Sequence, residues 1–316
     1  MNEPIDHHYL PTFYLSRWTG SDERLCRFSR PYGTVLVPKR IVPRGTAFEE
    51  RLYDFGPTSD GIPLSLEHSL LSKIDSDAAV ARDLLESQKT IAIVDKKNRE
   101  SWSKFLIAQM LRAPEDIEQL KHSVRQEWDR TAVEIQYEYE KERSPLDPKS
   151  VSEFIDKKSP DHIERLTHQI AERLLVHNGI AKLIAEMHWS VMEFSNDCSP
   201  LFTSDRPVWM TTTLTESDAF MWMPISPRAL FVAAPKPETV HVLLNRPRFQ
   251  FAKIVNKLLV QHAVKYVYAL DHRLSAFVDK HMGTTRHSTF LERLAVKRGL
   301  SVLDPNSPSA NLTTDG

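Results

Sequence analysis

Glycine is scarce in this chain, and its distribution limits both the fold and the chemistry. Only nine of the 316 residues are glycine, and none occurs between Gly61 and Gly179. Loops that bring the backbone close to a phosphate need glycine, and neither G-x-G-x-x-G nor G-x-x-x-x-G-K-[ST] is present. We therefore do not expect a dinucleotide-binding Rossmann half or a P-loop.

The glycine-free stretch has the apolar spacing of helices. Between residues 63 and 190, apolar side chains recur every three to four positions, and a charged segment from Glu115 to about Arg143 predicts one long, exposed helix. Before it, residues 22–39 contain two alternating apolar runs around a Pro/Gly turn, which predicts a β-hairpin.

The region from 187 to 270 has a different pattern, in which short apolar runs are separated by turn residues. Such runs are typical of strands. VKYVYAL at 264–270 is one example, and the alternation of Val240, Val242 and Leu244 resembles another. The sequence thus predicts an α+β fold, in which a helical middle region packs with a mostly antiparallel C-terminal sheet and an N-terminal β-hairpin that can join either.

No long linker separates these regions, so we expect a single compact domain over residues 1–300 and a disordered polar tail at 301–316. No window is apolar enough to span a membrane, and the N-terminus lacks the features of a signal peptide. We therefore expect a cytoplasmic protein with free thiols at Cys26 and Cys198, and no thiolate zinc site.

The charge balance argues against a broad nucleic-acid surface. The chain has 41 Lys+Arg and 42 Asp+Glu, a net charge of -1. Proteins that bind duplex nucleic acid usually have a clearly basic domain. A nucleic-acid or nucleotide partner is therefore not supported by net charge, although a small local basic site is compatible with it.

Four ordered motifs resemble a widespread microbial family known only as a domain of unknown function. HYLPTFYL at 8–15 is similar to the family opening H-Y-V-P-x-F-Y-L, and FTSDRPV at 202–208 is similar to F-x-T-S-D-x-P-V. Between them, Leu66-Glu67 with Ile74-Asp75 resembles L-E-x-x-L-x-x-I-E, and residues 109–112 resemble Q-x-x-R. Asp75 departs from the pattern, because the family more often has Glu there. The resemblance covers about residues 7–270 and implies a shared fold, but no agreed activity.

Four residues are candidates for catalysis. His8 could transfer protons or bind a metal, although it could equally hydrogen-bond a loop while its aromatic neighbours anchor the N-terminus. Glu67 and Asp75 border one apolar helix stripe and could hold a divalent cation or act as an acid/base pair, or they could pair with arginines. Asp205 lies in a loop that follows a strand, where it could be catalytic or could simply tie the turn.

Five further residues are candidates for substrate binding. Arg112 shares an inward helix face with Gln109, where it could grip a phosphate or form an ion pair with Glu67 or Asp75. Ser204 and Arg206 flank Asp205 in its loop. Asn256 interrupts an apolar helix face, so it is either a hydrogen-bonded core residue or a substrate contact.

These residues support two hypotheses about function. In the first, the protein is a hydrolase that acts on a phosphodiester or nucleotide, with a divalent metal as a candidate cofactor, and by analogy a nuclease in microbial defence against phage. In the second, it is a non-catalytic binding or scaffold protein. Its polar residues then form a structural network, and the charged 115–143 helix offers a partner surface.

Overall fold

The structure is a computed structural model that describes residues 5–58, 60–61, 63–87, 95–176, 178–211, 214–285, 289 and 292. The predicted tail at 301–316 lies outside these residues. Blocks of helix and of antiparallel strand follow one another along the chain, which confirms the predicted α+β class. Among the described residues, no helix has both the length and the apolarity needed to cross a membrane.

The predicted N-terminal hairpin is present as β2 (Leu25–Tyr32) and β3 (Val35–Ile41). Gly33 connects the two strands with a φ of 71°, a conformation that glycine adopts without a steric penalty. The hairpin joins C-terminal strands in a four-stranded sheet of order β3-β2-β12-β8, in which β12 is Val267–Ala269 and β8 is Thr203–Ser204. The N-terminal hairpin is therefore hydrogen-bonded, through β2, to a strand from the last part of the described chain.

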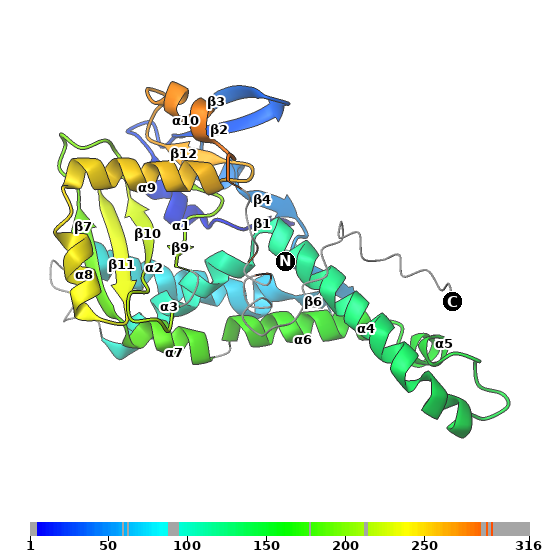
Figure 1. Ribbon diagram of the computed structural model, residues 1–316. Helices are drawn as coiled ribbons and strands as arrows, with labels where there is room; N and C mark the ends of the chain where they lie inside the picture. Colours follow the sequence, from blue (N-terminus) through cyan, green and yellow to red (C-terminus); the bar gives the residue numbers. More distant parts are fainter. Residues whose placement is uncertain are drawn as a thin grey trace, which may run out of the picture.

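A second four-stranded sheet has the order β7-β11-β10-β9, formed by His188–Glu193, Ala229–Ala234, Met221–Ser226 and Trp209–Met210. Its central strand β11 is buried throughout. Leu230 and Val232 pack with α8 (Pro237–Leu244) and α9 (Arg248–His262) on one face, while Phe231 packs against Trp102 of the helical layer on the other (Figure 1). Burial on both faces explains why ALFVAA is apolar at every position.

The strand suggested by alternation at 240–244 is wrong, because these residues belong to helix α8. Pro237 occupies the first turn of this helix, where proline is well tolerated. Val240 and Leu243 are buried three positions apart, whereas Val242 is 58% exposed. The apolar contacts thus follow helical rather than strand periodicity.

The helical layer begins with a π-helical turn, η3 (Glu67–Leu71), that leads into α2 (Ser72–Ser87). It continues with α3 (Lys96–Leu111), α4 (Pro114–Glu142), α5 (Val151–Lys158), α6 (His162–Val176) and α7 (Asn178–Glu186). The predicted long charged helix is α4, with 29 residues. Its C-terminal half projects from the body together with α5 (Figure 1).

Short N-terminal elements connect the layers. They are β1 (Asp6–His8), α1 (Thr12–Leu15), η1 (Ser16–Trp18), η2 (Pro43–Gly45), β4 (Phe48–Glu50), β5 (Asp54–Pro57) and β6 (Pro63–Ser65), and near the other end lies α10 (Ser275–His281). The buried Tyr14 hydroxyl donates to the carbonyl of Pro224 at 2.8 Å, and the Trp18 indole donates to the carbonyl of Leu201 at 2.8 Å. These bonds hold the aromatic opening segment against the strands.

Candidate functional site

Five of the nine candidate residues come together where β1, η3, α2 and α3 meet. We call His8, Glu67, Asp75, Gln109 and Arg112 the α2–α3 cluster. Gln109 and Arg112 are 3% and 1% exposed, which confirms that they face inward. His8, Glu67 and Asp75 are partly exposed.

Arg112 and Asp75 form the ion pair of the cluster. Arg112 Nη1 donates to Asp75 Oδ1 at 2.8 Å, so the guanidinium links the end of α3 to the first turn of α2. With its amide oxygen turned toward Arg112, Gln109 accepts hydrogen bonds from Nη2 and, at 2.6 Å, from Nε. The guanidinium donors are therefore used within the chain rather than directed at an open space.

The backbone of Arg112 is also engaged. Its carbonyl oxygen accepts a hydrogen bond from the buried Tyr53 hydroxyl at 2.8 Å. Tyr53 in turn stacks on His7, whose Nδ1 accepts from the Tyr53 amide at 3.1 Å. Arg112 thus joins α3 to both α2 and the β1 region.

The ionisable groups of the cluster influence one another. Burial raises the pKa of Asp75 above its ordinary value, while Arg112, by charge and hydrogen bond, and His8, by charge, lower it. His8 Nε2 hydrogen-bonds the carbonyl oxygen of Arg44 at 3.2 Å, and Tyr9 and Tyr14 are buried behind it. This is the loop-bonding arrangement that we considered for His8. Glu67 Oε1 accepts from Ser72 at 3.4 Å at the start of the π-helical turn.

The remaining candidates lie in the second half of the chain. Asp205 is 5% exposed, and its carboxylate accepts hydrogen bonds from the backbone amides of Val264 (3.0 Å), Lys265 and Tyr266 (2.9 Å). Burial raises the pKa of Asp205 to about 6, against the opposing effects of Arg206 and these three amides. The three hydrogen bonds from residues 264–266 show that the Asp205 carboxylate holds this segment of backbone in place.

Arg206 and Ser204 are also engaged in internal bonds. Arg206 pairs with Asp116, and it pairs with Glu115 at 2.5 Å. Ser204 Oγ accepts from the Arg206 amide at 3.1 Å and shapes the turn. These pairs tie the loop after β8 to the first turn of α4.

Asn256 lies apart from both groups, within α9. Its Oδ1 accepts from the amide of Phe202 at 2.8 Å, and its Nδ2 donates to the carbonyl of Pro200 at 2.9 Å. Asn256 is 2% exposed, so it makes the contacts of a hydrogen-bonded core residue.

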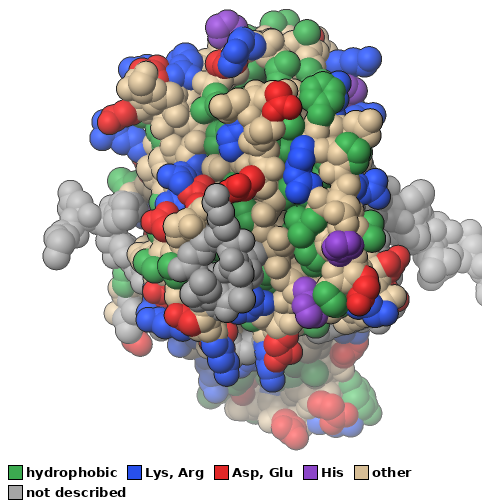
Figure 2. Space-filling model, turned by 90° about the vertical axis from the view of Figure 1, so that its left-hand side faces the viewer, with side chains coloured by type: hydrophobic (Ala, Val, Ile, Leu, Met, Phe, Trp, Pro, Cys, Tyr) green, Lys and Arg blue, Asp and Glu red, His purple; other side chains and the backbone are tan. Residues whose placement is uncertain are grey.

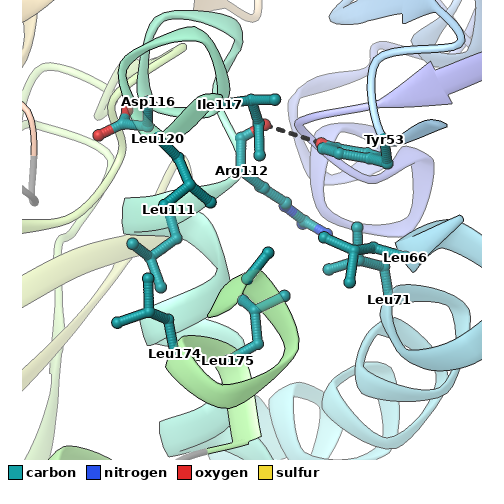
Figure 3. Close-up of a pocket in the computed structure, with 11 residues that line it drawn as sticks. Tyr53, Leu66, Leu71, Leu111, Arg112, Asp116, Ile117, Leu120, Leu174 and Leu175 are labelled. Atoms are coloured by element: carbon teal, nitrogen blue, oxygen red, sulfur yellow. Dashed lines mark hydrogen bonds between the residues drawn. The ribbon is translucent and has the colours of Figure 1, made fainter. Parts of the chain in front are cut away.

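A small apolar pocket adjoins the α2–α3 cluster. Arg112 runs along it toward Leu66 and Leu71, whereas the Asp116 carboxylate points to the other side (Figure 3). The volume open to the centre of a water molecule is about 10 Å³, which corresponds to roughly one water. The pocket as it stands has no room for a nucleotide.

Among the described residues, no three His, Cys, Asp or Glu side chains are grouped so that they could hold a metal ion. The hydrolase hypothesis includes a divalent metal as a candidate cofactor. Protein sites for such a metal usually need several oxygen or nitrogen ligands from these side chains. The α2–α3 cluster, with Asp75 committed to Arg112, therefore gives metal-assisted chemistry little support.

Sequence reasoning missed the partners of Arg206 and the role of Tyr53. Glu115 and Asp116 follow Pro114 in the first turn of α4, a position that favours acidic residues. That signal identified a helix start, but it gave no indication that an arginine about 90 positions later would meet it.

The comparisons with known proteins agree with the resemblance seen in the motifs. No curated protein and no solved structure matches the chain significantly. A family model described as "Protein of unknown function (DUF4238)" matches residues 6–273, which is most of the chain and includes every candidate residue. The chain therefore belongs to the DUF4238 family of proteins of unknown function.

Proposed function

We propose that the chain is a non-catalytic binding protein whose buried polar residues hold its layers together. The observation that carries this proposal is the internal engagement of Arg112 by Asp75 and Gln109. Two further buried residues are also engaged inside the protein: Arg206 pairs with two carboxylates, and Asp205 accepts hydrogen bonds from three backbone amides. A buried arginine that grips a substrate would instead keep donors directed at a cavity.

The proposed binding surface is the projecting α4–α5 arm, which we define as residues 127–158. Val133 and Tyr137 lie one turn apart on α4 and are 77% and 65% exposed, and Leu146 at the tip is 97% exposed. Single exposed apolar residues are ordinary, whereas Val133 and Tyr137 share one face of a projecting helix and can form a small apolar contact surface.

The charge of the arm indicates what kind of partner it would bind. Residues 127–158 contain nine acidic and six basic residues, a formal charge of −3, and the acidic excess lies in the α4 part of the arm. The body differs, because Lys/Arg and Asp/Glu side chains are interspersed on the face shown in Figure 2. We therefore propose a protein partner with a basic rim around an apolar patch, since complementary charge guides association.

Site-specific photo-crosslinking in the host cell tests this proposal. A photoreactive phenylalanine at position 137 should give one discrete adduct, whereas the same group at the exposed Val242 of α8 should not. Glu134→Lys with Glu138→Lys should remove the adduct, and the matched reversal of the exposed Glu216 and Asp218 should leave it. An adduct that survives the reversal on the arm, or no adduct at position 137, would contradict the proposal.

The hydrolase hypothesis is the second candidate, and one observation favours it. The π-helical turn brings Glu67 to the start of the helix that carries Asp75, near His8, and π-helical turns are frequent at functional sites. Hydrolysis of a phosphodiester would then use a carboxylate and His8 as acid and base. This hypothesis requires Asp75 and Arg112 to be dispensable for folding, which urea denaturation of their variants measures.

A cytoplasmic location remains a prediction, and the thiols of Cys26 and Cys198 are free, as expected.

A further inference from the structure

A second cavity, lined by none of the nine candidate residues, opens between the β2–β3 hairpin and the segment that joins α9 to β12. Its volume is about 470 Å³, which lies in the range of small-molecule sites. Cationic side chains from two elements line it, Arg27 and Arg30 from β2 and Lys265 from the joining segment, and no acidic side chain lines it.

Two of these cations already have partners. Arg30 donates to the carbonyl oxygens of Thr34 and Asp279, each at 2.5 Å, and lies 3.1 Å from the Asp279 carboxylate. Lys265 Nζ lies 3.0 Å from Glu49 and is half exposed. Their charges are largely compensated within the protein.

Arg27 is different, because no carboxylate of the described residues pairs with it. Its guanidinium lies 4.7 Å from the centre of the Tyr266 ring, and Nη1 donates to Thr46 Oγ1 at 3.4 Å. Nε is buried and has no hydrogen-bond partner among the described residues. Because the enclosed Nε is out of a ligand's reach, the donors that remain for an oxyanion are on the terminal Nη1 and Nη2 atoms, and Nη2 makes no hydrogen bond to the described residues.

Ser29 adds a second unpartnered donor to the same cavity. It is two positions after Arg27 on β2, so both side chains lie on one face of the strand, while Cys26 and Phe28 are buried in the core on the other. Ser29 is only 7% exposed, and its hydroxyl makes no hydrogen bond to the described residues. Its oxygen is not among the fully enclosed polar atoms that lack a partner, so the hydroxyl is open to the cavity and can bond a ligand there.

The opposite wall is held in place by Asp205. The amides of Val264, Lys265 and Tyr266 all bond its carboxylate, so this wall is fixed without any ligand. A site that is preorganised in this way loses less conformational freedom when a ligand binds.

We propose that this cavity binds the phosphate group of a small molecule, held by the terminal Nη atoms of Arg27 and the hydroxyl of Ser29. Phosphate is favoured over carboxylate because it has more acceptor oxygens, so Arg27, Ser29 and the nearby Lys265 can bond it together. The uncompensated charge of Arg27 also explains how a chain with a net charge of -1 can attract an anion at this place.

Isothermal titration calorimetry of the full chain tests the site, with sodium phosphate and sodium acetate as separate probes at constant ionic strength. We expect phosphate to bind, and Arg27→Gln and Ser29→Ala to weaken binding by about tenfold and threefold. Arg246→Gln removes the same charge from an exposed position outside the cavity and should change the affinity less than about twofold.

Each outcome of the titration is decisive. Equal weakening by Arg27→Gln and Arg246→Gln, or no heat with phosphate, would overturn the proposal, and binding of acetate in preference to phosphate would overturn the assignment to phosphate. Arg27→Lys keeps the charge but loses the planar guanidinium with its two terminal nitrogens, so it should weaken binding almost as much as Arg27→Gln. If Arg27→Gln does not fold, titrations of Arg27→Lys and Ser29→Ala against wild type decide the same question.

Discussion

At the scale of single residues, the sequence predicted which polar side chains are buried. It predicted their ion-pair and hydrogen-bond partners only where those partners lie on neighbouring helices. Helical spacing placed Gln109 and Arg112 on one inward face, and a buried charge requires a partner, so Asp75 was among the expected partners. The partners of Arg206 and Asp205 come from α4 and from residues 264–266. No local pattern reports contacts between segments so far apart in the chain.

Asp205 should make the stability of the protein depend on pH. Its pKa is about 6 in the folded protein, and an unfolded Asp has an ordinary pKa of about 3.9. Between these values the folded state binds more protons than the unfolded state, so the contribution of Asp205 to stability falls as the pH rises and is constant above about pH 7. We expect the free energy of unfolding of wild type, relative to Asp205→Asn, to fall by about 2 kcal/mol between about pH 4.5 and pH 7.

Urea denaturation of both proteins at each pH measures this difference. Asp147→Asn serves as the control, because it makes the same change in the turn after α4, away from Asp205, so the pH dependence that belongs to Asp205 is the difference between the two profiles. If the free energy of unfolding of wild type, relative to Asp205→Asn, rises with pH, the three amide hydrogen bonds rather than burial dominate the titration of Asp205, which would contradict the prediction.

At the scale of elements, the hairpin, the long helix α4 and the final strand were all predictable, because each has an uninterrupted period and clear turn residues. The prediction failed at α8, where Val240, Val242 and Leu244 alternate within eight residues. A segment that short contains about two helical turns, so its apolar residues fit either period. Contacts with β11 and β7 decide the outcome in favour of the helix.

The turn of the hairpin gives a prediction at this scale. Gly33 has a φ of 71°, and a Cβ added there would meet nothing within 4 Å, so any cost of substitution comes from the backbone alone. We expect Gly33→Ala to lower the free energy of unfolding by about 1 kcal/mol. Gly45→Ala is the control, because Gly45 is not among the residues with positive φ and its added Cβ would meet the Ile41 side chain at an ordinary 3.4 Å. It should be neutral or stabilise the protein by up to about 1 kcal/mol in thermal unfolding. Equal losses for the two variants would contradict the backbone argument.

At the scale of the whole molecule, polar bonds connect layers that hydrophobic packing brings together. Arg112 joins α3 to α2, Arg206 joins the loop after β8 to α4, and Asp205 holds the segment before β12. The nine candidate residues lie in two groups with separate bonds, and Asn256 lies apart from both. The cavity at Arg27 could not be predicted, because its walls come from nearly opposite ends of the described chain.

The central claim is that these polar residues stabilise the fold rather than carry out a reaction. Urea denaturation of Arg112→Met and of Arg112→Met with Asp75→Leu tests it most directly. The single variant leaves Asp75 without its cation and should lose about 3 kcal/mol, and the double variant should recover at least half of that loss, because no unpaired charge remains. As a control, Arg130→Gln breaks only the exposed pairs with Glu127 and Glu134 and should leave the stability of the protein close to that of wild type. An Arg112→Met variant as stable as wild type would contradict the claim and favour the catalytic hypothesis for the α2–α3 cluster.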